Sequence, residues 1–404
     1  MPLARHGRLA MLDGALLVAM ALQWWAVLGL DHRRGPSLRH SLLAGLACSL
    51  LLLLKAPAAV PLLLGSLALR WLEPDRARPH WTPLLLGLAL GLLPGLGWHL
   101  LHLLERGPEA LAMWTSQGFA RVGASVENHA GGPLPPLLEV LKGGWPWLPL
   151  WPFALALAWR QRRRRPGHWG LGLTLLTALL VLPLRTQLPW YSLLLWPPFC
   201  LVCAPILAWL VQPGCHDRPP GARLAAAIPW FWAALGVLLL LALPAAKLGL
   251  LPLPRAALPL LLSLGSGLLA GGALLLRPDQ RCRTAGGGLL VGGVWLTLAL
   301  LLAGPLWLWE LNESWSVPPV VGLVSRPMAM QPGDAIGLWH EAERPSLNWY
   351  LGRRVISAEK AEDLDPGAAA VVLLSREEPS PAGWTCRLEG RSADLGLYRC
   401  QPLS

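Results

Sequence analysis

The chain has 404 residues, of which 54% are hydrophobic and only 14% are charged. A soluble globular domain carries about a quarter charged residues, so this composition excludes an ordinary soluble protein and indicates a membrane protein. The net charge of +11 divides unevenly: residues 1–309 carry 25 basic and 10 acidic side chains, whereas residues 310–404 carry 9 and 13. No basic surface interleaved with aromatic residues accompanies the excess, so we exclude nucleic acid as a partner and read the charge as a topology signal.

Ten leucine-rich runs are predicted to be membrane-spanning helices, because most approach the roughly 20 residues that cross about 30 Å of hydrocarbon. Residues 41–54 and 57–72 are short and are expected either to cross separately or to form a re-entrant pair around the break at Lys55. The predicted fold class is an α-helical polytopic membrane protein. Its spans are residues 12–30, 41–54, 57–72, 82–104, 145–159, 168–183, 190–211, 224–246, 256–276 and 285–309.

Lys and Arg set the predicted orientation, because cytoplasmic loops carry an excess of both residues. Five short loops hold 16 of them, whereas the opposite side of residues 1–309 holds 9 over longer segments. We therefore expect a multi-pass protein of the plasma (inner) membrane with both chain ends outside. The basic loops are residues 31–40, 70–81, 160–167, 212–223 and 277–284.

Two domains are predicted, a transmembrane domain at residues 1–309 and an extracytoplasmic α/β domain at residues 313–404. The transmembrane domain includes a long outer loop at residues 105–144, and loops of this length are usually functional or disordered. In the tail, strands are predicted at residues 335–340, 353–357 and 369–374, with helical segments at residues 346–351 and 358–364. Cys386 and Cys400 both lie in this tail and are expected either to form a disulfide or to remain free thiols.

Polar residues at span boundaries are the candidates for chemistry, because charge near hydrocarbon is costly and persists mainly for function or anchoring. Asp13 opens the first span, where its carboxylate would orient a substrate hydroxyl or act only as a helix-start residue favoured by the dipole. Lys55 ends an apolar run on the same face. Its ammonium is either a binding group for a lipid phosphate or a snorkelling lysine without a ligand.

Further candidates lie at the other outer boundaries. Arg121 is a candidate clamp for phosphate oxygens, and His129 is a candidate ligand of a metal or a phosphate, although a lone loop histidine is more often simply solvated. Arg185 and Tyr191 flank the start of a later span, where Tyr191 has the alternative role of an interfacial anchor. We assign no cofactor, and a divalent metal stays open because His129 has no visible partner ligand.

These boundary motifs, in this order, resemble those of lipid-dependent GT-C glycosyltransferases of the protein mannosyltransferase and aminoarabinose transferase type. Each motif is weak alone, but their shared order extends over nearly the whole chain. The similar segments are R-L-A-M-L-D at 8–13, L-L-L-K-A-P at 52–57, G-F-A-R at 118–121 with N-H at 128–129 and G-P at 132–133, W-P-W at 145–147, R-T-Q-L-P-W-Y at 185–191 and P-S-L-N-W-Y-L-G-R at 345–353.

The resemblance implies an enzyme that transfers a sugar from a polyprenyl-phosphate donor to a lipid, glycan or protein acceptor on the outer face, among membrane lipids. It implies that Asp13 is a catalytic residue, the second acidic side chain that lines the cavity. It implies substrate- or lipid-phosphate-binding roles for the remaining candidates, which are Lys55, Arg121, His129, Arg185 and Tyr191.

The sequence departs from the family's pattern at its start, because the family's leading carboxylate lies in an Asp-Glu motif and no such motif precedes Arg8. The ten predicted spans look like the last ten of a thirteen-span protein, so about three N-terminal spans carrying the motif are expected upstream. Two alternatives remain. One is a truncated, non-catalytic relative that binds lipid phosphate or acts as a scaffold. The other is a secondary transporter, which internal repeats and mid-membrane polar residues would indicate.

Overall fold

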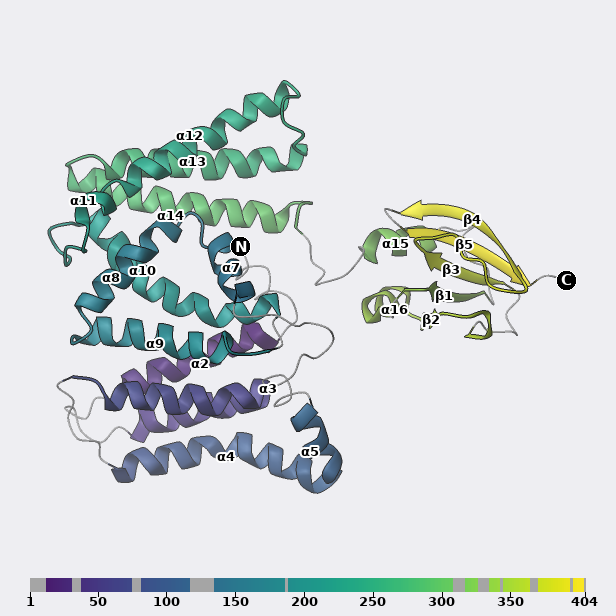
Figure 1. Cartoon of the computed structure of the whole chain (residues 1–404), viewed down its shortest axis with the longest axis horizontal. Coiled ribbons are helices and arrows are strands. Elements are labelled where there is room, and N and C mark those ends of the chain that lie inside the picture. The colour runs from purple at the N-terminus through teal and green to yellow at the C-terminus, as the bar shows by residue number, and fades with distance from the viewer. Residues whose placement is uncertain are drawn as a thin grey trace. The chain divides into compact units, whose positions relative to one another are not determined.

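The computed structural model describes residues 12–30, 38–74, 81–116, 134–185, 188–307, 317–325, 334–341, 344–363, 370–392 and 395–402. The chain divides into two compact units (Figure 1). The helical unit comprises Met1–Trp309, and the C-terminal unit, built around a sheet, comprises Glu310–Ser404.

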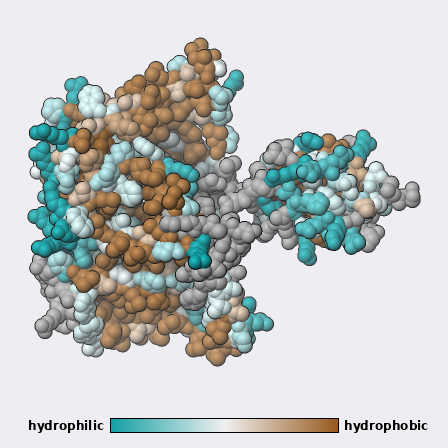
Figure 2. All heavy atoms as spheres, viewed as in Figure 1, coloured by the Kyte–Doolittle hydropathy of each residue, from teal (hydrophilic) through white to brown (hydrophobic). Residues whose placement is uncertain are grey.

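The helical unit is built almost entirely from helices (Figure 1). Leucine and alanine, both strong helix formers, dominate these helices. Figure 2 shows apolar side chains over much of their visible face, as lipid contact requires. The elements are α2 (Leu12–Leu28), α3 (Leu38–Trp71), α4 (Trp81–Arg106), α5 (Pro108–Trp114), α7 (Leu134–Gly143), η3 (Leu148–Leu150), α8 (Trp151–Arg160), α9 (Arg165–Val181), η4 (Pro189–Leu195), α10 (Trp196–Val211), α11 (Ala222–Ala225), α12 (Ile228–Lys247), η5 (Arg255–Ala257), α13 (Leu258–Leu275) and α14 (Gln280–Ala303).

Six helical segments of the described chain are long and apolar enough to cross a membrane, which is fewer than the ten predicted. The predicted spans on either side of Lys55 form the two arms of one segment, α3, which is counted once here. Three further helices are shorter than the roughly 20 residues that cross a membrane, because α2 and α9 have 17 residues each and α8 has 10. Pro146 and Pro149 precede α8, and proline disfavours a helix interior. The multi-pass helical fold is confirmed, and the described chain has fewer long apolar helices than the ten spans predicted.

The α3 segment folds back on itself at Lys55. This residue has φ −159° and ψ 76°, an extended conformation, and Pro57 follows closely. The Cys48 Sγ atom lies 3.9 Å from the carbonyl oxygen of Ala59, 11 residues away. A straight helix would separate such positions by about 16 Å. The two arms of α3 are therefore antiparallel, and Lys55 lies at their apex.

The first arm of α3 packs backbone to backbone on α4. A Cβ atom added to Gly91 would lie 2.4 Å from the carbonyl oxygen of Leu42, so only glycine fits there. The Ser49 hydroxyl donates to the Gly91 carbonyl (2.8 Å) and accepts from the Gly95 N–H (3.0 Å). This close contact fixes the arm that leads up to the apex.

Basic side chains gather at the other end of the helical unit. Glu73, buried just after α3, forms ion pairs with Arg70 (3.0 Å) and Arg165 (2.8 Å). Arg165 also donates to the carbonyl of Leu28, at the end of α2. Asp13 opens the same helix, about 22 Å away by the helical rise. The basic end and the apex of α3 are therefore opposite ends of the helical unit.

The C-terminal unit contains a five-stranded sheet in the order β2-β1-β3-β5-β4. Strands β2, β1 and β3 are parallel, whereas β5 runs antiparallel to both β3 and β4. The strands are β1 (Ala335–Trp339), β2 (Ile356–Ala358), β3 (Val371–Ser375), β4 (Trp384–Ser392) and β5 (Leu395–Pro402), and the helices are α15 (Val317–Val324), α16 (Pro345–Leu351) and η6 (Ala361–Asp363).

The prediction of a small α/β fold is confirmed for this unit, with two differences. The helix predicted at residues 358–364 is a strand end followed by the short η6. The β4–β5 hairpin was not predicted, because β4 is an edge strand whose polar and apolar residues show no clear burial pattern. Helices α15 and α16 share one apolar cluster with one face of the sheet, while Tyr398 and Cys400 lie in a cluster on the other face.

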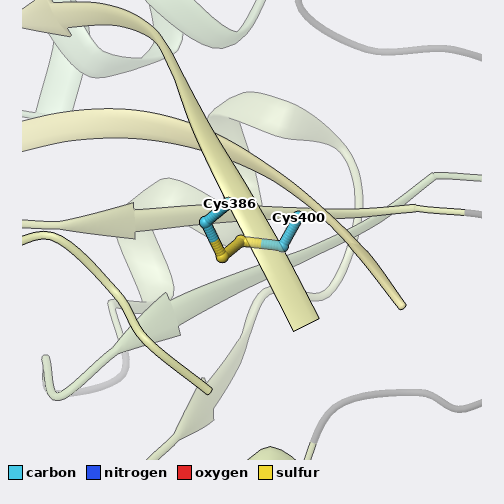
Figure 3. Close-up of a disulfide and its surroundings, with 2 residues drawn as sticks. All are labelled: Cys386 and Cys400. Atoms are coloured by element: carbon cyan, nitrogen blue, oxygen red, sulfur yellow. A yellow bond between two sulfur atoms is a disulfide. The ribbon is translucent and has the colours of Figure 1, made fainter. Parts of the chain in front are cut away.

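Cys386 and Cys400 form a disulfide between β4 and β5 (Figure 3). The two residues are directly paired in the register of this antiparallel hairpin. Of the two alternatives that the sequence left open, the structure has the disulfide and not the free thiols. Disulfides persist mainly in oxidising compartments.

Candidate functional site

Asp13, Lys55 and Tyr191 meet at one end of the helical unit, where α2 begins, α3 turns and η4 lies. The Lys55 Nζ atom is 3.0 Å from Asp13 Oδ1. The same atom is 4.3 Å from the centroid of the Tyr191 ring. Three of the six predicted site residues, distant in sequence, thus form one group, which we call the apex cluster.

Burial differs across the apex cluster. The Asp13 side chain is 9% exposed and Tyr191 is 4% exposed, whereas the Lys55 side chain keeps 34% of its surface accessible. Asp13 lies in the first turn of α2, where the helix dipole favours a negative charge. The face of the Tyr191 ring stabilises the ammonium by about 0.5–2 kcal/mol. Lys55 is therefore held by two buried partners while about a third of its side-chain surface stays accessible.

Local sequence explains how Tyr191 reaches this position. Leu188 is extended (φ −109°, ψ 142°), as expected of a residue that precedes a proline, and Pro189 starts η4. The Tyr191 N–H donates to the Leu188 carbonyl at 3.0 Å, which closes the first turn. Leu188 and Tyr191 are both buried in the apolar cluster that includes α2, α3 and α9. The turn thus directs the Tyr191 ring towards Lys55.

The other predicted site residues are not part of this cluster in the described chain. Arg185 is exposed on the segment that leads to η4, and it makes no described contact with Asp13 or Lys55. Arg121 and His129 lie outside the described residues. Among the residues that the structure does describe, no group of three or more His, Cys, Asp or Glu side chains could hold a metal ion. The roles of these three residues, and the metal alternative, remain predictions.

The sequence reasoning missed a histidine–tryptophan group on α4 and α5. His99 Nε2 lies 3.2 Å from the carbonyl oxygen of Leu52, in the last turn of the first α3 arm. The His99 ring meets Trp114 edge to face (5.1 Å), and Trp98 stacks on His102 (5.0 Å). The W-H-x-x-H spacing at 98–102 was the available signal, because it places polar rings within one helical turn at the end of a span. These rings support the arm that ends at the apex.

Comparison with known proteins gives a structural relationship and no sequence relationship. No protein-family model and no curated protein matches the chain. The structure is similar to ArnT from Cupriavidus metallidurans bound to undecaprenyl phosphate, with a TM-score of 0.61 and 17% identity. It is also similar to the apo state of that protein, with a TM-score of 0.63 and 15% identity. Both matches cover 96% of this chain and 74% of ArnT. The chain therefore has an ArnT-like fold.

Proposed function

We propose that this protein is a membrane glycosyltransferase that moves a sugar from a polyprenyl-phosphate donor to an acceptor on the non-cytoplasmic face. The observation that carries the proposal is the apex cluster, a partly exposed lysine held between a buried carboxylate and a buried aromatic ring. The cluster lies in a fold shared with ArnT, which has been crystallised with undecaprenyl phosphate. Lys55 is the proposed binding group for the donor phosphate.

Sugar transfer requires a change of partners at Lys55. Before the donor binds, Lys55 neutralises Asp13. In our proposal the donor phosphate draws the ammonium away, which leaves the Asp13 carboxylate free to accept a proton. The acceptor oxygen then attacks the anomeric carbon, the bond from that carbon to the phosphate oxygen breaks, and Asp13 takes the acceptor's proton. Lys55 stabilises the negative charge that develops on the departing lipid phosphate.

The remaining predicted residues complete the proposal around this step. Tyr191 holds the ammonium near the donor through its ring face. Arg185, exposed and close in sequence to η4, is proposed to contact the donor phosphate or the acceptor. Arg121 and His129 are proposed to bind the substrate or the lipid phosphate, as the family resemblance implies.

Two observations support an outward-facing site in the plasma (inner) membrane. The basic end, with Arg70 and Arg165, is opposite to Asp13 in the helical unit, and basic loops face the cytoplasm. The disulfide of the C-terminal unit suits an oxidising compartment, in line with an extracytoplasmic position for that unit. Lipid, glycan and protein acceptors all suit a site on that face.

Binding of undecaprenyl phosphate to the purified protein in nanodiscs tests the proposed role of Lys55. We expect Lys55→Met to weaken binding at least tenfold, because the ammonium is the proposed phosphate ligand. Lys142→Met is the matched control, since the Lys142 side chain is 70% exposed on α7 and lies 3.9 Å from Glu139. Equal binding by the wild type and Lys55→Met would contradict the proposal.

Consumption of a polyprenyl-phosphate sugar by the same samples separates catalysis from binding. Release of polyprenyl phosphate that requires Asp13 supports the transferase. Tight, Lys55-dependent binding with no release of sugar from the donor would instead favour the non-catalytic lipid-phosphate-binding protein.

A further inference from the structure

Helix α16 of the C-terminal unit presents two aromatic side chains outward. Leu347 is fully buried, and Leu351, four residues later, packs against the same apolar cluster. The opposite side of the helix must then face away from this cluster. Trp349 is 84% exposed and Tyr350 is 59% exposed. Because tryptophan is highly buried on average in soluble domains, this exposure indicates a contact surface.

Two arginines follow immediately and are held in place by the end of α16. Gly352 has φ 63°, a left-handed conformation that favours glycine at the end of a helix. The Arg353 N–H donates to the Asn348 carbonyl (3.3 Å), and the Val355 N–H donates to Asn348 Oδ1 (2.8 Å). Both Arg353 and Arg354 are exposed. The cap therefore fixes the backbone of two exposed arginines that directly follow α16 and its exposed rings.

We call Trp349, Tyr350, Arg353 and Arg354 the aromatic–basic patch. The patch is positively charged, whereas the unit that carries it has a net negative charge, because residues 310–404 hold 9 basic and 13 acidic side chains. Arg376 pairs with Glu341 at 3.0 Å, but no described carboxylate pairs with either arginine of the patch. Guanidinium groups without an internal partner are suited to bind phosphate oxygens.

The C-terminal unit is also tethered near a bilayer. Helix α14 ends at Ala303 and α15 begins at Val317, so 13 residues connect a membrane helix to this unit. Fully extended, that connection spans about 45 Å. A tether of this length gives the patch a high effective concentration at the lipid headgroups.

We propose that the aromatic–basic patch docks on the surface of an anionic lipid bilayer. Trp349 and Tyr350 enter the headgroup region, where amphipathic aromatic rings are enriched. Arg353 and Arg354 bind the lipid phosphates. Each basic residue near an anionic surface strengthens binding about fivefold. The patch would thus fix the C-terminal unit against the membrane, independently of any sugar donor.

Photo-crosslinking of the full chain in nanodiscs tests this proposal. The probe is p-benzoylphenylalanine in the substitution Trp349→p-benzoylphenylalanine, and the discs contain either phosphatidylglycerol with phosphatidylethanolamine or phosphatidylcholine alone. The matched control is Leu388→p-benzoylphenylalanine, because Leu388 is 44% exposed on β4 of the same unit. Mass spectrometry counts the lipid adducts, and an intact Cys386–Cys400 disulfide reports folding of the unit.

We expect several-fold more lipid adducts at position 349 than at position 388 in the anionic discs. Adding Arg353→Ala and Arg354→Ala should lower the yield at position 349 at least fivefold, and phosphatidylcholine discs should show a similar loss. Three results would overturn the proposal. The first is an equal yield of lipid adducts at the two positions, and the second is that adducts at position 349 form mainly with a protein segment. The third is a lipid yield at position 349 that does not change when both arginines are replaced. No donor is present, so the outcome is independent of transferase activity.

Discussion

Asp13 Oδ1 and Lys55 Nζ lie 3.0 Å apart although 42 positions separate the two residues in the chain. The contact joins the first turn of α2 to the apex of α3, and Tyr191 adds η4 to the same point. Because α3 reverses direction at Lys55, an ammonium that would otherwise lie in the middle of a long helix is presented at one end of the helical unit. The reversal of α3 thus creates the apex cluster.

Removing the Lys55 ammonium should destabilise the protein, because Asp13 would keep a buried charge without a partner. Since Lys55 is 34% exposed, we expect Lys55→Met to cost about 1–3 kcal/mol, less than for a fully buried pair. The double variant Asp13→Asn, Lys55→Met should recover most of this loss. Thermal unfolding in detergent measures all four combinations. Strictly additive effects would show that the two side chains do not interact.

Glu73 should matter far more for stability than other charges at the helix ends. Its buried carboxylate accepts from Arg70, Arg165 and Trp169 Nε1 (3.2 Å). Glu73→Gln would leave the arginines without their counter-charge, and we expect a loss of about 2–4 kcal/mol because Arg165 is partly exposed. Glu139→Gln is the control, since its partner Lys142 is 70% exposed at 3.9 Å and the pair should contribute less than about 0.5 kcal/mol. Similar melting temperatures for the two variants would contradict this ranking.

Two glycines of α4 offer a matched test of the α3–α4 contact. A Cβ on Gly91 would meet backbone atoms of Leu42 and Leu46 at 2.4 and 2.6 Å, whereas a Cβ on Gly97 would meet nothing within 4 Å. Gly91→Ala must therefore push the helices apart, with an expected loss of about 2 kcal/mol or more. Gly97→Ala should be neutral or stabilise by up to about 1 kcal/mol. Equal unfolding temperatures for both variants would mean that the contact is not tight.

The sequence predicted the features that depend on local patterns. The K-A-P break at 55–57 indicated a reversal, and leucine-rich runs indicated membrane helices, because both signals lie within a few residues. The number of spans was less predictable. Pro146 and Pro149 turn the start of one apolar run before α8 begins, so that α8 has only 10 residues. The helices α2 and α9 are also shorter than a typical span. Apolar composition alone does not distinguish these cases.

The sequence pattern did not predict contacts between segments that are distant in the chain. Asp13, Lys55 and Tyr191 were each selected as boundary residues, but only the packing of α2, α3 and η4 brings them together. The contact between His99 Nε2 and the Leu52 carbonyl oxygen likewise depends on how α4 packs against α3. The β4–β5 hairpin escaped prediction because an edge strand needs no regular apolar alternation.

The Cys386–Cys400 disulfide should stabilise the C-terminal unit without affecting the helical unit. The bond closes a segment of 14 residues, and the chain-entropy model assigns about 3 kcal/mol to a loop of that size. Because β4 is the edge strand next to β5 in the described sheet, reduction should first loosen this edge. We expect faster amide exchange at residues 384–402 after treatment with a reductant. Peptides from α13 and α14 serve as the internal control and should not change. Unchanged exchange in the hairpin would show that backbone pairing alone holds β4, whereas faster exchange throughout the chain would show that the two units unfold together.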